Sequence, residues 1–220
     1  MMLARGATVA AVLGVVIGPV ALAVLGLTHP SDLTPSTAIY WRDLHLIALP
    51  IFPLLGTNLW WLLGSANDAA SWLARVAAFV YIIFYSALDV LAGIGTGAVV
   101  ATASGADVSA ATSELFAQGN DLAGIGVLAY LLGVLLTSAL LVARFGRTAA
   151  PGAALLVAGA LVFLDSHIYF PDGVSAMLAT AAGCGWLQWA RLRSPSPVRE
   201  AGPDHPTVAP ASGATGVGEP

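Results

Sequence analysis

Six long apolar runs constrain what this chain can fold into. A helix needs about 20 apolar residues to cross the hydrocarbon core of a bilayer, because it rises about 1.5 Å per residue. Runs of this kind cover residues 7–27, 44–64, 75–98, 122–143, 149–168 and 173–190. The segments between them, including residues 101–120, are rich in residue types that form connections. The sequence therefore predicts an all-α, polytopic integral membrane protein in which residues 1–193 form a bundle of six transmembrane helices.

Composition supports lipid as the main solvent of this domain. Hydrophobic residues make up 58% of the chain and charged residues 9%, whereas soluble domains average roughly a quarter charged residues. The net charge of −4 offers no basic surface, so we expect no nucleic-acid partner. The expected partner is the lipid bilayer, and other membrane subunits are an open alternative. Residues 194–220 are rich in Pro, Gly and Ser, which predicts a disordered tail.

The arginines predict an orientation. All eight basic residues are arginine, which, with the abundance of Ala, Gly and Val, is typical of a GC-rich bacterial genome. One set of helix ends carries Arg5, Arg75, Arg144, Arg147, Arg191, Arg193 and Arg199. Only Arg42 falls at the opposite ends. The positive-inside rule then predicts a multi-pass protein of the cell membrane with both termini, and the tail, in the cytoplasm.

Aromatic residues predict the two interfaces. Trp60, Trp61, Trp72, Trp186 and Trp189 are expected at the inner interface, and Tyr40, Trp41 and Tyr169 at the outer one. The first run also resembles a signal peptide, because residues 21–23 read ALA, as at a cleavage site. The apolar run continues beyond them and is long enough to span, so we favour an uncleaved first helix.

Three histidines fall at the outer ends of the predicted helices, each near an aspartate. The pairs are His29 with Asp32, His45 with Asp43, and His167 with Asp165. Imidazoles beside carboxylates are typical of zinc, copper and iron sites, so His45, His167 and His29 are candidate metal ligands. We expect His45 and His167 to share a pocket in which Asp165 or Asp43 accepts a hydrogen bond from an imidazole. The alternative is that these residues only end their helices, and no tight motif such as HExxH supports the metal.

Asp89 lies inside the third run, where an ionised carboxylate is costly to bury. We therefore expect it to be protonated or hydrogen-bonded. The candidate partners are Tyr85, Ser86, Tyr130, Asn58 and His45. Two interpretations stay open: a polar clasp between helices, and a proton- or cation-binding site.

Prolines and glycines predict how the helices pack. Pro50 and Pro53 predict a kink in the second helix beneath His45. Such a kink would open a cavity toward the outer face, and the alternative is a kink that serves packing alone. Gly93 and Gly97 form a small-xxx-small pair, which predicts close packing of the third helix against the fourth. The single cysteine, Cys184, excludes an intrachain disulfide and a cysteine metal cluster.

The residues leave three functional classes open. The lack of any catalytic motif favours a non-catalytic membrane component or accessory subunit with a polar His/Asp cluster at its extracytoplasmic face. A small proton- or cation-coupled transporter that uses Asp89 is the first alternative. The second is an intramembrane enzyme, or a metal or haem protein, that uses His45, His167 and neighbouring acids. No substrate and no definite cofactor follow from the sequence.

Overall fold

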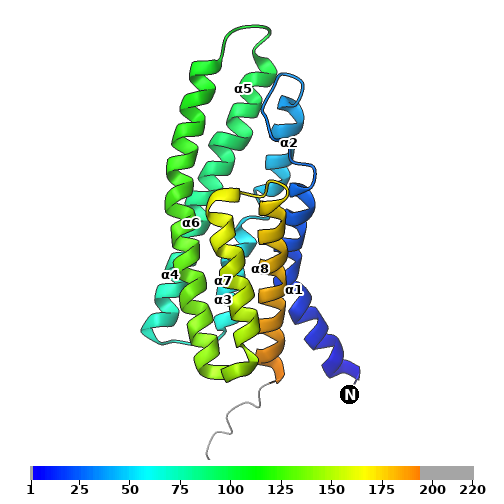
Figure 1. Ribbon diagram of the computed structural model, residues 1–220, viewed down its shortest axis with the longest axis vertical. Helices are drawn as coiled ribbons and strands as arrows, with labels where there is room; N and C mark the ends of the chain where they lie inside the picture. Colours follow the sequence, from blue (N-terminus) through cyan, green and yellow to red (C-terminus); the bar gives the residue numbers. More distant parts are fainter. Residues whose placement is uncertain (1, 194–220) are drawn as a thin grey trace, which may run out of the picture.

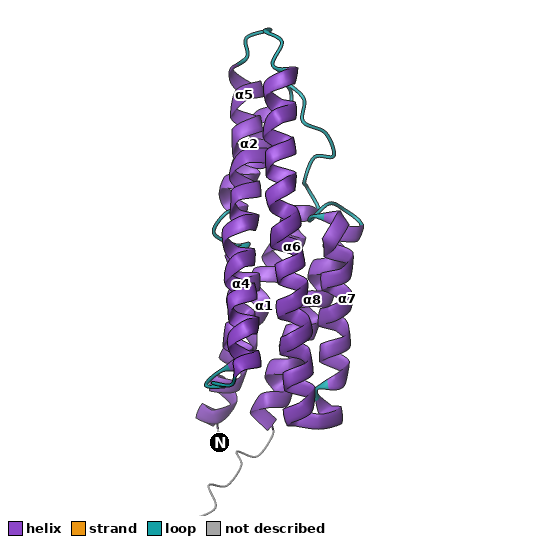
Figure 2. Cartoon of the chain, turned by 90° about the vertical axis from the view of Figure 1, so that its left-hand side faces the viewer, coloured by secondary structure: helices purple, strands orange, loops and turns teal. Residues whose placement is uncertain are grey.

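The apolar runs fold as helices in the computed structural model, which describes residues 2–193, with side chains described from Gly6 onward. The predicted tail, with Arg199 and His205, lies outside the described residues. The helices are α1 (Met2–Gly26), α2 (Ala38–Ala48), α3 (Pro53–Leu63), α4 (Ala69–Leu88), the π-helix η1 (Asp89–Gly95), α5 (Thr96–Thr102), α6 (Ser109–Phe145), the 3₁₀ turn η2 (Gly146–Thr148), α7 (Ala150–Ser166) and α8 (Asp172–Arg193). Residues 2–193 contain no strand (Figure 2). The predicted all-α membrane bundle is confirmed.

Four helical segments are long and apolar enough to cross a membrane. They are Gly6–Gly26, Ala38–Leu63, Ala69–Thr102 and Ser109–Thr148. Helix α7 is apolar but shorter. The chain is therefore a multi-pass membrane protein. The number of six spans and the cytoplasmic location of the termini stay predictions.

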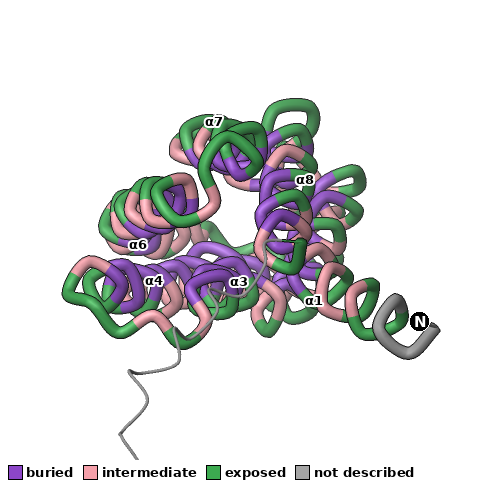
Figure 3. Tube along the Cα trace, turned by 90° about the horizontal axis from the view of Figure 1, so that it is seen from below, coloured by how far each residue is buried: buried purple, intermediate pink, exposed green. Residues whose placement is uncertain are grey.

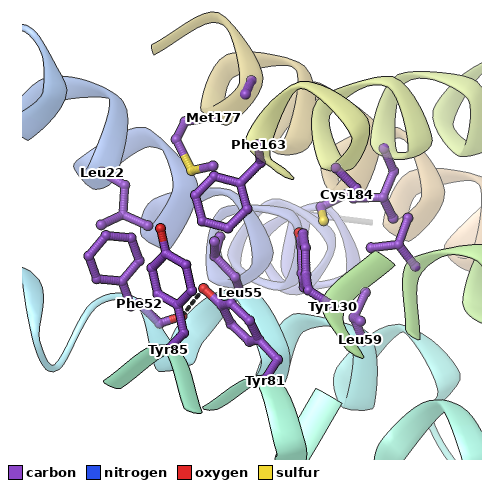
Figure 4. Packing of buried hydrophobic residues seen from close by; sticks show 14 of the residues in the cluster. Leu22, Phe52, Leu55, Leu59, Tyr81, Tyr85, Tyr130, Phe163, Met177 and Cys184 are labelled. Carbon is purple, nitrogen blue, oxygen red and sulfur yellow. Dashed lines mark hydrogen bonds between the residues drawn. The ribbon is translucent and has the colours of Figure 1, made fainter. Parts of the chain in front are cut away.

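The helices close into a ring around an aromatic interior. Figure 3 shows α3, α4, α6, α7, α8 and α1 in that order around the bundle, and neighbours in this ring are in contact. Tyr81, Tyr85 and Tyr130 lie inside it together with Phe52 and Phe163 (Figure 4), and all five are at most 2% exposed. Leu22 of α1 is also fully buried, so the first helix is an integral part of the packing.

Helices α5 and α6 extend well beyond the end of α7 at one end of the bundle (Figure 1). Helix α6 has 37 residues, about 55 Å at the standard rise, whereas α7 has 17, about 25 Å. The upper part of α6 therefore packs against α5, and α5 packs against α2, above the end of α7 (Figure 1). The expected connection at 101–120 is wrong, because the helix already begins at Ser109 and only residues 103–108 are non-helical. Exposed polar residues such as Glu114 and Gln118 suit a helix that extends past the apolar layer.

Proline interrupts the second predicted helix, as expected. Helix α2 ends at Ala48, residues 49–52 form turns, and α3 begins at Pro53. Pro53 occupies the first turn of α3, where its missing N–H costs no intrahelical hydrogen bond. The break gives α2 its own direction above the ring (Figure 1).

The glycine prediction is wrong about the partner helix. A Cβ atom on Gly93 would meet the ring of His45, and one on Gly97 would meet the backbone of Arg42, so both glycines face α2. The glycine that lets η1 and α6 approach closely belongs to α6. It is Gly119, where a Cβ atom would lie 2.9 Å from the Cβ of Ala92. The π-helix η1 thus packs between α2 and α6.

Three of the arginines lie at the end of the bundle opposite to α2 and α5, and they bond to the helix ends and connections there. We call this end the arginine end. Arg75 donates to the carbonyls of Gly64 and Ala66 at 2.8 and 2.7 Å, and Arg191 donates to the carbonyl of Trp61 at 2.5 Å. Arg144 pairs with Asp68 at 2.7 Å. The end that carries His29 and His167 is called the histidine end below.

Candidate metal centre

Three histidines from three separate segments meet at the histidine end. His29 follows α1, His45 lies in the last turn of α2, and His167 follows α7 directly. One ring nitrogen of each lies within 4.8 Å of the others. The ring centroids of His29 lie 5.0 Å from His45 and 5.6 Å from His167, and those of His45 and His167 are 6.1 Å apart. The chain thus brings together residues that are up to 138 positions apart in sequence.

Backbone carbonyls fix the tautomers of two of these rings. The Nδ1 atom of His29 lies 2.8 Å from the carbonyl oxygen of Pro30. The Nδ1 atom of His45 lies 2.7 Å from the carbonyl oxygen of Trp41, one turn earlier in α2. A carbonyl oxygen can only accept, so each Nδ1 carries the hydrogen and donates it. In the neutral form, the Nε2 atoms of both rings therefore carry lone pairs.

Those two lone pairs face each other. The Nε2 atoms of His29 and His45 are 3.4 Å apart. Burial lowers the pKa of His29 to about 4, since the charged ring loses hydration. A proton shared between the two nitrogens is therefore disfavoured at neutral pH. Two such lone pairs can bind one cation between them.

His167 is held in place by an unusual backbone conformation. Its φ of +46° lies in a region that residues with a Cβ atom rarely adopt, at a cost of about 1–3 kcal/mol. Gly173 of α8 allows this turn, because a Cβ there would overlap the backbone of Ile168. The Nδ1 atom of His167 lies 2.5 Å from the hydroxyl of Tyr85. Burial also lowers the pKa of His167 well below its usual value, so this ring is neutral as well.

Aromatic side chains enclose the three rings. Trp41 and Tyr169 meet the His29 ring edge-on at centroid distances of 4.9 and 4.4 Å. Phe52 packs against His167 at 5.4 Å. Trp41 is 3% exposed and donates its indole N–H to the carbonyl of Ala92. Its predicted role as an anchor at the outer interface is therefore wrong, because it lies inside the site.

The carboxylates do not take the predicted place beside the imidazoles. Asp43 pairs with Arg42 at 2.8 Å, and Asp32 accepts from the hydroxyl of Ser31. Asp165 is exposed in the last turn of α7. The expectation that Asp165 or Asp43 accepts from an imidazole of His45 or His167 is wrong. The Nδ1 atom of His45 is bonded to the carbonyl of Trp41, and the Nδ1 atom of His167 to the hydroxyl of Tyr85.

Asp89 begins the π-helix η1 and is fully buried. Neither carboxylate oxygen has a hydrogen-bond partner among the described residues. The partners expected from the sequence do not reach it. Asn58, for example, donates to the carbonyl of Val15 at 2.7 Å. The polar clasp is therefore absent from the described part of the chain.

A cavity of about 440 Å³ is lined by Asp89 together with His45 and His167. It lies between η1, α6 and α7 at the histidine end, and Trp41 and His45 of α2 also line it. Its polar lining consists of His45, His167, Tyr85, Asp89, Asn120, Asp165 and Tyr169. Its apolar lining includes Leu88, Phe116, Val127, Phe163 and Leu164.

No family model, curated protein or solved structure matches this chain. The structure brings the predicted residues His29, His45, His167 and Asp89 together at or around one cavity, with Asp165 at its lining and Asp43 apart from it.

Proposed function

We propose that this protein is a membrane metalloprotein that holds one zinc ion between His29, His45 and His167. The observation that carries the proposal is the opposed pair of Nε2 lone pairs 3.4 Å apart. Two nitrogens on a tetrahedral zinc ion, each at about 2.0–2.1 Å, are separated by about 3.3–3.4 Å. The spacing of these two atoms therefore already matches one edge of such a site.

The surroundings of the rings support the same assignment. Ligating histidines donate their other N–H group to a carbonyl or carboxylate, which fixes the ring and raises its basicity. His29 and His45 donate to the carbonyls of Pro30 and Trp41 in this way. The lowered pKa values keep His29 and His167 unprotonated at neutral pH, so a metal ion does not have to displace a proton from either ring.

Three histidines also favour a catalytic type of zinc site over a structural one. Structural zinc sites have four protein ligands, whereas catalytic sites have three and leave the fourth position to water or substrate. Haem, the other possibility raised by the sequence, fits less well. All three rings lie within 6.1 Å of one another, and this leaves no flat gap for a macrocycle between any two of them.

The proposed location is the extracytoplasmic face of a bacterial cell membrane. The arginine end carries Arg75, Arg144 and Arg191, which the positive-inside rule assigns to the cytoplasm. The histidine end then faces outward. Zinc would reach the site from that side without crossing the bilayer.

The test is the metal content of the detergent-purified protein after dialysis against zinc. We expect one zinc per chain. His29→Ala, His45→Ala and His167→Ala should each weaken binding by more than the roughly 10–100-fold that loss of a second-shell partner costs. His205→Ala, in the predicted tail, is the matched control and should bind as the unchanged protein does. Retention of full zinc by all three variants would refute the site.

One observation favours a second candidate, the passage of the ion through the bundle. Buried polar side chains continue from the cavity toward the arginine end, at Tyr130, Thr137, Ser138, Thr180 and Gln188. Tyr130 and Thr180 interact with each other, and Thr137, Ser138 and Gln188 each have a side-chain oxygen without a partner among the described residues. Such groups can line a hydrated path. Zinc uptake into vesicles that contain the purified protein separates this candidate from a fixed site, since a fixed site gives stoichiometric binding without uptake.

A further inference from the structure

We propose that the metal centre hydrolyses an acyl ester or amide bond of a membrane lipid, with Asp89 as the proton acceptor for the metal-bound water. This inference rests on the proposed zinc site and assigns it a reaction and a substrate class. The position of Asp89 and the balance of charge support its role as proton acceptor, and the lining of the cavity supports the substrate class.

Asp89 is placed by the same helix that contacts two of the ligands. Tyr85, one turn before it, bonds to Nδ1 of His167. Gly93, about one turn after it, lies directly against the ring of His45. Asp89 therefore lies between these two contacts on the face that lines the cavity. It also opens a π-helix, and π-helical turns inside α-helices are frequent at functional sites.

The charge of the site favours an acid near the proposed ion. Three neutral imidazoles leave the two positive charges of zinc uncompensated, and buried charge is costly unless it is paired. The ion pairs found within residues 6–193 are Arg42 with Asp43 and Arg144 with Asp68. Asp89 is thus a fully buried acid without a cationic partner among the described residues, and it shares a cavity with the proposed cation. The carboxylate of Asp89 would balance one positive charge of the zinc ion, and the ion would give the buried carboxylate a cation.

The reaction follows from these parts. Zinc lowers the pKa of a bound water to about 7, and the carboxylate of Asp89 takes one proton from it. The resulting hydroxide attacks the carbonyl carbon of the acyl group and forms a new C–O bond. The bond from that carbon to the ester oxygen or amide nitrogen then breaks, and Asp89 returns the proton to the leaving oxygen or nitrogen. One water is consumed, and the products are a carboxylic acid and an alcohol or amine.

The lining of the cavity selects the substrate class. Its wall toward α6 and α7 is formed by apolar side chains such as Phe116, Val127, Phe163 and Leu164. Asn120 and Asp165 are exposed residues of the same lining, so the cavity has a polar rim. Helix α7 ends at Ser166 while α6 continues past it (Figure 2). The cavity therefore lies where an acyl chain from the bilayer and a polar headgroup meet, and a lipid fits both parts.

The experiment uses the zinc-loaded full chain in detergent micelles. The probes are a fluorogenic ester of a C16 fatty acid, a fluorogenic C16 amide and the acetate ester of the same fluorophore. We expect hydrolysis of at least one C16 probe and a much lower kcat/KM for the acetate. Asp89→Asn should lower kcat by about 10²–10⁴-fold, the usual contribution of a general base, and should keep one zinc per chain. Asp121→Asn, an exposed acid of α6 outside the cavity lining, is the matched control and should keep full activity.

The outcomes separate the two levels of the proposal. A chain that binds no zinc refutes the metal centre itself. A chain that binds one zinc but hydrolyses none of the three probes overturns the hydrolytic role and leaves the metal centre standing. Full activity in Asp89→Asn, or loss of zinc from that variant, overturns the role of Asp89 as proton acceptor. Equal kcat/KM values for acetate and C16 esters overturn the lipid as substrate class.

Discussion

Gly93 of η1 lies directly against the imidazole of His45 in α2, with no room for a Cβ atom between them. The contact fixes one side of the His45 ring, and the carbonyl of Trp41 fixes its Nδ1 atom. The position of a proposed ligand thus depends on the absence of a side chain in a neighbouring helix.

Gly93→Ala should therefore displace His45 and weaken zinc binding at least about tenfold, because ligand positions within a fraction of an ångström matter for a metal site. Gly97→Ala is the matched control. It crowds the backbone of Arg42, also in α2, but leaves His45 untouched. Both variants should lose about 1–3 kcal/mol of unfolding free energy from overpacking. Zinc titration of the two purified variants checks the difference, and equal affinities would contradict the role of Gly93.

The conformation of His167 predicts an order of stability between two variants. His167→Ala and His167→Gly both remove the imidazole, and they differ only in a Cβ atom. At φ +46°, that atom costs about 1 kcal/mol or more. In zinc-free protein, the Gly variant should therefore unfold at higher denaturant concentration than the Ala variant. The reverse order would show that the turn after α7 is not strained. Neither variant should bind zinc at the wild-type affinity.

Asp68 gives a pH dependence at the arginine end. Its carboxylate accepts from the backbone N–H of Ser71, accepts from the Ser71 hydroxyl and pairs with Arg144, and these contacts lower the pKa of Asp68 below its usual 3.8. A lowered pKa in the folded state adds stability above the unfolded pKa, and this stability is lost as the pH falls through the folded value. Wild type should thus exceed Asp68→Asn in stability at neutral pH.

The difference in unfolding free energy between wild type and Asp68→Asn should disappear as the pH falls below about 3.8, because Asp68 itself becomes protonated. Denaturant unfolding of both proteins in micelles across this range measures it. Asp121→Asn removes the same charge at an exposed position and serves as the control. A stability gap that persists unchanged into acid would mean that the charge of Asp68 contributes nothing and that only its capping geometry matters.

Orientation is tested by reporter fusions at four positions. Fusions after Gly105 and after Phe170 should behave as exported, and fusions after Arg147 and Arg193 as cytoplasmic. Arg147 and Arg193 lie toward the arginine end, and Phe170 lies beside the histidines. The opposite pattern would place the proposed zinc site on the cytoplasmic side.

Much of the fold follows from the sequence because hydrocarbon imposes a simple rule. Every backbone polar group must be paired within its own segment, so each apolar run has to be a helix. The same rule explains where the prediction failed. Residues 109–120 are polar and were expected to be a connection, but outside the apolar layer polarity no longer distinguishes a helix from a loop.

The candidate site was only partly predictable. The positions of His29, His45 and His167 at the ends of their apolar runs predicted that all three lie at the same depth in the membrane. The N–H acceptors are backbone carbonyls, of Pro30 and Trp41, and every residue has a carbonyl, so no sequence pattern marks them. Trp41 at four residues before His45 was a usable signal, since residues at this spacing share a helix face. Which helix packs against Gly93 depends on the direction that α2 takes relative to α3 at the proline break between them. The sequence does not specify this direction.

The π-helix η1 makes chain length, rather than side-chain identity, the sensitive variable in this stretch. Below it, α4 presents one face to α6, and above it, α5 presents another face to α2. A π-turn takes up one extra residue relative to an α-turn. Deleting one residue from Asp89–Gly95 would rotate everything beyond it by about 100°. Gly97 would then leave α2, and a scan of single-residue deletions would find a narrow intolerant window inside a helix that accepts many substitutions.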